Sequence, residues 1–399
     1  MKSKSKIWLV VVSLLYLLFF NCSMDLGIDP VKPPPQPETT VFPHVEYKML
    51  PPAGKLPYPH HDPEFTELQY LELNRTLWII NNFAQYQGSG TKESLYFHDG
   101  LDIVLENGTK IFAVDSGYVR YIFDGGPSYT TVVIEDANTS DYAWMYTHVY
   151  YLNVKVGDFV SQGTHIADVN FDGLGHIHFG RAFLAEDGAW DNMYDWHYVQ
   201  PDDYFIYTDN QAPVIEQPFY YFVNNSDEQF HRANPTLISG DVDIVIGMRE
   251  RGEYAHSKDS QFGDRLCVSR IEYEISGDSI ETIHKKSFDF GKIILKARPE
   301  VGFQDYERVS TVFKYYETIH PDGPPNWDKV ISYYVITNCD GSGEFGQIDP
   351  VAKNFCWRTN ETNPPGERRF PNGTYTIKVT AYDFKGNFAT AWEKVVVEN

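Results

Sequence analysis

Cysteine is scarce in this chain, with four residues among 399, at positions 22, 267, 339 and 356. None of them is spaced like the thiolate pairs of a zinc site, which excludes that class of metal centre. Cys339 and Cys356 are close enough in sequence to close a loop, so a disulfide between them is expected in a compartment that permits it. Cys267 would then be either a buried thiol or an unpaired one.

Long hydrophobic runs are also missing after the first twenty residues, which argues against a membrane-spanning helix in the rest of the chain. The N-terminus starts with three lysines, continues with an apolar run from Ile7 to Phe20 and ends in a cysteine. Because this run is shorter than the roughly 20 residues that a bilayer requires, residues 1–21 are predicted to be a secretory signal peptide. The mature chain is expected to be exported.

The segment LFFNC at the end of this run resembles the lipoprotein box of bacterial envelope proteins. The resemblance implies that Cys22 becomes the first mature residue and carries a lipid, which would anchor the protein in the cell envelope, on the periplasmic or outer-membrane side. Asn21 departs from the small residue usual at its position, so a plain secretion signal with an incidental cysteine is the alternative. Residues 22–60 are rich in proline, as expected of an extended tether.

Basic side chains are in deficit, with 33 Lys and Arg against 55 Asp and Glu and a net charge of −22. Removal of the signal peptide takes away three lysines and no acids, which leaves a net charge of −25. Such an acidic surface argues against nucleic acid and anionic lipid headgroups as partners.

Aromatic residues, by contrast, are abundant at 16% of the chain, and glycine and proline are scattered throughout. This composition favours many short strands and turns, so the fold is predicted to be mainly β. A first folded domain is expected at residues 61–208, where short β segments such as TTVVIED and HIHFGRAF alternate with turns such as DGGPS and FDGLG.

A second domain is expected at residues 209–399. The alternating segments TYTIKVTAYD and EKVVVE, with the turn DFKGN between them, are typical of the last two strands of a β-sandwich. This tail resembles the bacterial immunoglobulin-like domains that often follow exported enzymes. Insertions are expected within 247–265 and 300–370. The expected role of this domain is contact with an envelope protein partner.

Two histidines separated by one residue stand out in the segment GLGHIHFG. On a strand, His176 and His178 would point to the same side, about 6.6 Å apart. One imidazole could then hold a metal while the other acts on a substrate. The pair alone is weak evidence, because such spacing also occurs by chance.

Two further segments strengthen this interpretation. YFHDGLDIVL contains His98 and Asp102 at an even spacing, which in extended structure would place both side chains on one side. Two imidazoles and a carboxylate make a zinc site that leaves a fourth position open for water. YAWMYTHVYY places His148 near the end of an aromatic-rich strand.

Together these segments resemble the lysostaphin and LytM type of zinc metallopeptidases, which cut peptides in bacterial cell walls. HDGLDIVLENGTKIFAVDSGYVRYI is similar to the H-x-G-x-D segment of this family and its following hairpin, and VKVGDFVSQGTHIADV is similar to the connection before the paired histidines. The resemblance covers residues 95–185. It implies a sandwich or barrel-like β domain of the duplicated hybrid motif type.

Carried over position by position, the resemblance implies that His98, Asp102 and His178 bind Zn²⁺, while His148 and His176 act on the reacting water and the substrate. Which of these two is the general base stays open. The implied function is hydrolysis of peptide bonds in peptidoglycan, in a stem peptide or a cross-bridge. The alternative is a non-catalytic envelope lipoprotein that binds peptidoglycan or regulates another hydrolase.

Overall fold

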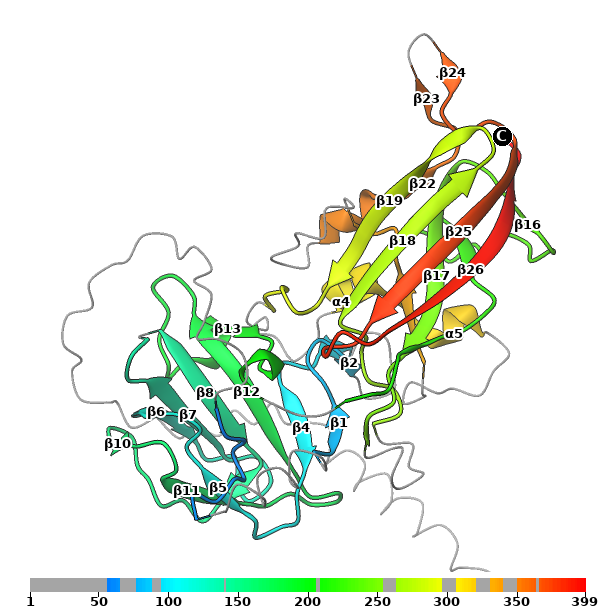
Figure 1. The fold of residues 1–399 in the computed structure, drawn as a ribbon. Coiled ribbons are helices and arrows are strands. Elements are labelled where there is room, and N and C mark those ends of the chain that lie inside the picture. Colours follow the sequence, from blue (N-terminus) through cyan, green and yellow to red (C-terminus); the bar gives the residue numbers. More distant parts are fainter. Residues whose placement is uncertain are drawn as a thin grey trace, which may run out of the picture. The chain divides into compact units, whose positions relative to one another are not determined.

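The computed structural model describes residues 56–64, 77–87, 95–139, 141–205, 209–253, 263–295, 306–320, 331–339, 350–363 and 366–399 (Figure 1). The predicted signal peptide, Cys22 and most of the proline-rich tether lie outside these residues. Residues 49–399 form one compact unit. No helix within the described ranges is long and apolar enough to cross a membrane.

The described residues are mainly β, as predicted, and most strands before residue 205 belong to two sheets. The larger sheet has the order β1-β4-β12-β8-β7-β6-β10, with β13 added beside β12, and the smaller has the order β5-β11-β9. The strands of the larger sheet are β1 (Ile79–Asn81), β4 (Leu101–Val104), β6 (Gly117–Phe123), β7 (Thr131–Asp136), β8 (Tyr142–Thr147), β10 (Phe159–Val160), β12 (His176–Leu184) and β13 (Trp196–Val199). Those of the smaller sheet are β5 (Lys110–Phe112), β9 (Val149–Tyr150) and β11 (His165–Val169).

The central strands of the larger sheet enclose an apolar core. β7 and β8 are buried along almost their whole length, as expected of strands whose two faces are both covered. Trp144 of β8 stacks on Phe179 of β12 with their ring centroids 5.2 Å apart. Arg181 is also buried here, where it pairs with Asp136 and lies over the Trp144 ring, so its charge is neutralised inside the core.

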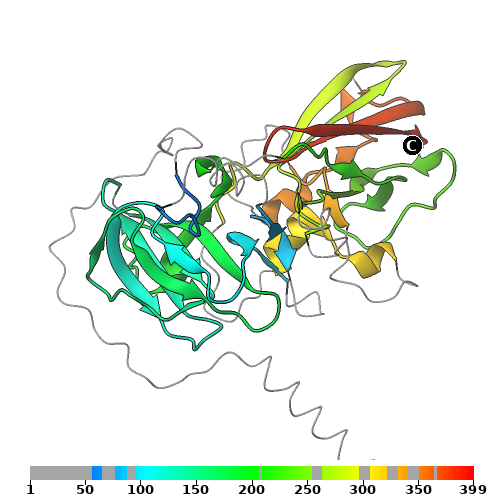
Figure 2. The ribbon, with the colours of Figure 1, turned by 60° about the horizontal axis from the view of Figure 1, so that its bottom comes forward.

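The register of three neighbouring strands places the candidate site residues in one row. β12 runs antiparallel to both β4 and β8, and the three lie side by side in both views (Figures 1 and 2). His178 of β12 pairs with Asp102 of β4 on one side and with Thr147 of β8 on the other. His148 follows directly after Thr147, the last residue of β8, and is therefore next to this row.

Most strands after residue 209 belong to two further sheets, while the short strands β23 (Thr362–Asn363) and β24 (Glu367–Arg368) pair with each other. One has the order β14-β17-β21-β20, with β15 and β22 also paired to β17, and the other has the order β16-β26-β25-β18-β19. Their strands are β14 (Val214–Ile215), β15 (Tyr220–Val223), β16 (Thr236–Ile238), β17 (Asp241–Arg249), β18 (Arg270–Gly277), β19 (Ile280–Asp289), β20 (Phe313–Lys314), β21 (Ser332–Val335), β22 (Trp357–Arg358), β25 (Gly373–Tyr382) and β26 (Phe388–Val397). The described residues after 263 include the short helical segments α4 (Tyr306–Val312), α5 (Tyr316–Ile319) and η4 (Pro350–Asn354).

The two sheets share one core, because alternate residues of β17, β18 and β25 are buried in the same hydrophobic cluster. The predicted final hairpin is confirmed: β25 and β26 pair along their full length around the turn DFKGN. The immunoglobulin-like assignment stays a prediction. Residues 300–370, within which insertions are expected, supply β20, β21 and β22 to the first of these sheets.

The predicted disulfide is wrong in this structure, where neither Cys339 nor Cys356 takes part in a disulfide. The Sγ atom of Cys339 lies 3.3 Å from the carbonyl oxygen of Ile336 and 3.4 Å from that of Lys286. The thiol is therefore engaged with backbone acceptors at the end of β21. Cys267 is a buried free thiol, which was one of the two states predicted for it.

A small two-stranded pairing precedes the site. β2 (Tyr86–Gln87) pairs with β3 (Tyr96–Phe97) immediately before His98. Side chains of this hairpin belong to the hydrophobic cluster that contains the core of the C-terminal sheets, whereas Leu266 belongs to the cluster in the N-terminal sheets. Residues on the two sides of the predicted domain boundary thus share cores, and the boundary itself stays a prediction.

Candidate metal centre

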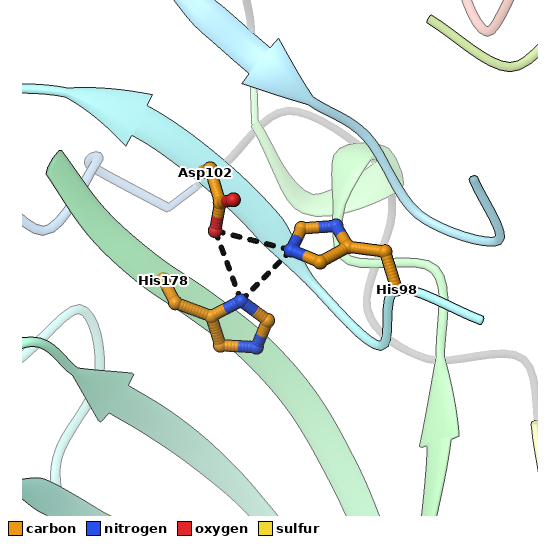
Figure 3. A group of neighbouring side chains, drawn as sticks. All are labelled: His98, Asp102 and His178. Carbon is orange, nitrogen blue, oxygen red and sulfur yellow. Dashed lines mark hydrogen bonds and ion pairs between the residues drawn. The ribbon is translucent and has the colours of Figure 1, made fainter. Parts of the chain in front are cut away.

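Three side chains from distant parts of the sequence meet at one point: His98, Asp102 and His178 (Figure 3). Nε2 of His98 lies 3.1 Å from Oδ1 of Asp102, and Nδ1 of His178 lies 3.0 Å from the same oxygen. The two ring nitrogens are 3.0 Å apart. The structure therefore brings together, in one compact triangle of donor atoms, the three residues implied as metal ligands.

His98 does not lie in a strand, contrary to the extended arrangement expected for the H-x-G-x-D segment. β3 ends just before it, and the chain bends at Gly100 before β4 begins. A Cβ atom at Gly100 would lie 2.6 Å from the carbonyl oxygen of Phe179 and 3.0 Å from Nε2 of His178. Because glycine has no Cβ atom, the bend can pass this close to β12 and carry His98 toward Asp102.

The second nitrogen of each histidine in the triangle is also held. Nδ1 of His98 donates to the backbone carbonyl oxygen of Asn82 at 3.0 Å, and Nε2 of His178 lies 3.1 Å from Oδ1 of Asp99. In the neutral form of each ring, these contacts favour the tautomer in which the lone pair of His98 Nε2 or His178 Nδ1 faces the triangle. Partners of this kind orient the imidazole ligands of metals and increase their basicity.

The second oxygen of Asp102 is held in the same way, because Nδ2 of Asn81 donates to Oδ2 at 2.6 Å. This leaves Oδ1 as the atom directed at the two histidines. No sequence pattern indicated the three supporting residues Asn81, Asn82 and Asp99. Asp99 lies inside the H-x-G-x-D segment, but nothing in its local pattern indicates that it contacts a histidine 79 residues further along the chain.

The donor set fits a tetrahedral zinc ion. Bonds of about 2.0–2.1 Å from zinc to histidine nitrogen and carboxylate oxygen place neighbouring ligand atoms about 3.3 Å apart. The distances of 3.0–3.1 Å in the triangle are close to this value. Two imidazoles and one carboxylate are also a donor set of catalytic zinc sites, which keep a fourth position open.

Two more histidines lie beside the triangle. The rings of His148 and His176 are 4.7 Å apart between centroids, and Phe171 packs against both, at 4.4 Å and 4.3 Å. Nδ1 of His148 donates to the carbonyl oxygen of Ser128 at 2.6 Å, and Nδ1 of His176 donates to that of Leu174 at 2.7 Å. In both rings Nε2 therefore remains as a proton acceptor.

The five histidine and aspartate residues of this site lie in a segment that matches a known protein family. The model described as peptidase family M23 matches residues 96–185, the stretch that contains all five of these histidine and aspartate residues. Through these residues, the chain belongs to peptidase family M23. None of the curated proteins searched matches the chain.

Solved structures similar to the M23 domain overlap between 24% and 40% of this chain. LytU is 30% identical, over 32% of this chain and 90% of its own, with a TM-score of 0.25. The catalytic domain of lysostaphin from Staphylococcus simulans is 24% identical, over 31% of this chain and 93% of its own, with a TM-score of 0.24. A putative M23 peptidase of Pseudomonas aeruginosa is 26% identical over 24% of this chain, which spans 41% of that protein, with a TM-score of 0.20.

The electrostatics of the M23 site suit a cation. Burial alone would raise the pKa of Asp102, but the neighbouring charges of His98 and His176 hold it well below its usual range. Burial alone would lower the pKa of His178, whereas its bonds to Asp102 and Asp99 raise it to about 9. A metal that binds here must therefore displace a proton from His178.

The pKa of His148 is shifted in the opposite direction from that of His178. Burial and, to a smaller extent, the nearby His176 lower its pKa to about 3, although the Ser128 carbonyl favours the charged form. The imidazole of His148 is therefore neutral at pH 7, and its Nε2 lone pair can accept a proton. His148 also has φ of 65°, a left-handed conformation that is uncommon outside glycine and is frequent at functional sites.

Proposed function

We propose that this protein is a zinc-dependent metalloendopeptidase that hydrolyses peptide bonds in peptidoglycan. The observation that carries the proposal is the convergence of His98, Asp102 and His178 on one point, with His148 and His176 beside it. The match of residues 96–185 to peptidase family M23 supports peptidase chemistry. All five polar positions of the site are filled, as an active enzyme requires.

In this proposal His98 Nε2, Asp102 Oδ1 and His178 Nδ1 hold the zinc ion. When bound, zinc supplies a Lewis acid that polarises the scissile carbonyl group and lowers the pKa of water to about 7. Asp99 keeps the His178 ring in the tautomer that can bind a cation.

We assign proton transfer to His148 and His176. Nε2 of His148 takes the proton of the attacking water, because its Nδ1 proton is committed to the Ser128 carbonyl and the ring is neutral at pH 7. His176, with Nδ1 bonded to the Leu174 carbonyl, acts on the developing oxyanion or the leaving nitrogen in its protonated form, in which Nε2 carries the proton that is donated. Phe171 covers both rings and restricts their rotation.

The test is to incubate the mature chain, residues 22–399, with purified sacculi and to identify released fragments by mass. Release of cut peptides is expected with zinc, loss of release after chelation, and recovery when zinc is restored. The matched control is His284→Ala, which removes a largely exposed histidine of β19 and should keep full activity. A zinc-loaded chain that binds sacculi without cutting them would contradict the proposal and support the non-catalytic alternative.

We further propose that the enzyme is anchored in the cell envelope through a lipid on Cys22, with residues 23–60 as the tether. The support is the LFFNC segment after a basic and apolar N-terminus. Expressed from its own signal peptide, the wild-type chain is expected in the membrane fraction, and Cys22→Ala in the soluble exported fraction. Equal distribution of the two chains would rule out the anchor.

A further inference from the structure

A segment of the C-terminal half, residues 263–267, contacts the residues that support the metal centre. The backbone of Cys267 and the side chain of Asn82 form two reciprocal hydrogen bonds. Cys267 N–H donates to Oδ1 of Asn82 at 2.8 Å, and Nδ2 of Asn82 donates to the Cys267 carbonyl oxygen at 2.8 Å. Both residues are buried, with 3% of Asn82 and none of Cys267 exposed.

The same Asn82 holds a member of the donor triangle through its backbone. Its carbonyl oxygen accepts the Nδ1 proton of His98 at 3.0 Å. Two bonds to one amide group fix both its position and its rotation, so the Cys267 backbone determines where the Asn82 peptide stands. A shift of this peptide would move the acceptor that orients the His98 ring.

A second set of contacts connects Arg265 to Asp102 through Asn81. Nη2 of Arg265 lies 3.4 Å from Oδ1 of Asn81, which also accepts from Nε2 of Gln85 at 3.0 Å. The amide nitrogen of Asn81 donates to Oδ2 of Asp102 at 2.6 Å. Residues 265 and 267 therefore reach two of the three donors through adjacent asparagines.

The fit between this segment and β1 is close. Gly263 has φ of +73°, and a Cβ atom there would lie 2.8 Å from the carbonyl oxygen of Ile79. A Cβ atom at Gly252 would lie 3.0 Å from the same oxygen. Leu266, between the two contact residues, is 2% exposed and packs in the core of the N-terminal sheets. Gly252, Gly263 and the buried Leu266 thus allow the segment to pack closely against β1, the strand that ends at Asn81.

We propose that residues 263–267 are a structural part of the metal centre, and that through Asn81 and Asn82 the C-terminal half sets the zinc affinity of the M23 site. This inference rests on the proposed zinc binding. Asn81, Asn82, Arg265 and Cys267 are positioning residues, because each acts on the metal through His98 or Asp102. They all lie outside residues 96–185, the part of the chain that matches the family.

The test uses the full mature chain and measures the zinc dissociation constant by competition with a chromophoric chelator. Asn82→Ala removes both bonds to Cys267 and leaves two buried backbone groups without partners. It is expected to weaken zinc binding about 10- to 100-fold, the usual effect of losing the partner of a ligand. If Asn82→Ala binds zinc as tightly as the wild-type chain, the inference is overturned.

A matched control separates positioning from general destabilisation. Thr359→Ala also removes buried hydrogen bonds, from the threonine hydroxyl to the Gly240 carbonyl and to Asn399, within the C-terminal half. It should lower the melting temperature and leave the zinc dissociation constant unchanged. If Thr359→Ala weakens zinc binding as much as Asn82→Ala, stability and not positioning accounts for the effect, and the inference is wrong.

A milder variant covers the case in which Asn82→Ala does not fold. Arg265→Ala removes one long contact to Asn81 and is expected to weaken zinc binding several-fold, with Arg265→Lys in between; an unchanged affinity in Arg265→Ala would contradict the inference. The wild-type measurement also separates this inference from the proposed function. A wild-type chain that binds no zinc defeats both, whereas tight wild-type binding with unaffected variants defeats the inference alone.

Discussion

Replacement of His178 by alanine is expected to abolish zinc binding and peptide hydrolysis together. Nδ1 of His178 is 3.0 Å from both other donors, so its loss leaves two ligands where a catalytic zinc site has three. The remaining carboxylate, Asp102, would also lose the imidazole that balances its buried charge. Zinc content and release of sacculus fragments, measured on one preparation, should both fall to background.

The control for this experiment is a histidine variant that preserves the triangle. His284→Ala, on the exposed face of β19, should retain one zinc ion per chain and full activity. A His178→Ala protein that is folded, as judged by circular dichroism, and still binds one zinc ion tightly would remove His178 from the ligand set. Loss of activity with retained zinc would instead place His178 in the chemistry.

Replacement of His148 has the second largest expected effect and a different signature. His148 stands outside the triangle, with its ring 6.3 Å from that of His178 between centroids. Zinc content should therefore stay at one per chain, while the rate falls about 10²- to 10⁴-fold, as expected for loss of a general base. Because the pKa of His148 is held at about 3, the ring stays neutral above that value, and the loss should be equal at pH 6 and pH 8.

The backbone at this position determines the choice of variant. His148 has φ of 65°, a conformation that asparagine tolerates better than alanine, so His148→Asn separates loss of the imidazole from backbone strain. Both variants should show the same rate loss. Full activity in His148→Asn would exclude His148 from the mechanism, and loss of zinc in that variant would make His148 a ligand.

The site could be predicted from sequence where it depends on local periodicity. His176 and His178 share one face because side chains alternate along β12, and both contact Asp102 as that alternation requires. The same reasoning was wrong for His98, which reaches the site through a bend and not through an extended strand. The bend depends on the closeness of Gly100 to the Phe179 carbonyl, a tertiary contact that spacing does not reveal.

The supporting residues show the limit of such reasoning more clearly. Asn82 and Cys267 are 185 residues apart, and nothing in either local sequence predicts that an asparagine amide will bind that backbone. The error at Cys339 and Cys356 has the same origin. Their nearness in sequence suggested a bond, whereas the fold directs Cys339 toward backbone carbonyl groups. By contrast, the β25–β26 hairpin was predictable, because its alternation and its turn are contiguous in the chain.

The most direct measurement is X-ray diffraction at the zinc absorption edge from crystals of the mature chain grown with zinc. One anomalous peak is expected among His98 Nε2, Asp102 Oδ1 and His178 Nδ1, with bonds of about 2.0–2.2 Å and no fourth protein ligand. A crystal with no peak between these three atoms, or with the peak bound by other residues, would contradict the proposed metal centre.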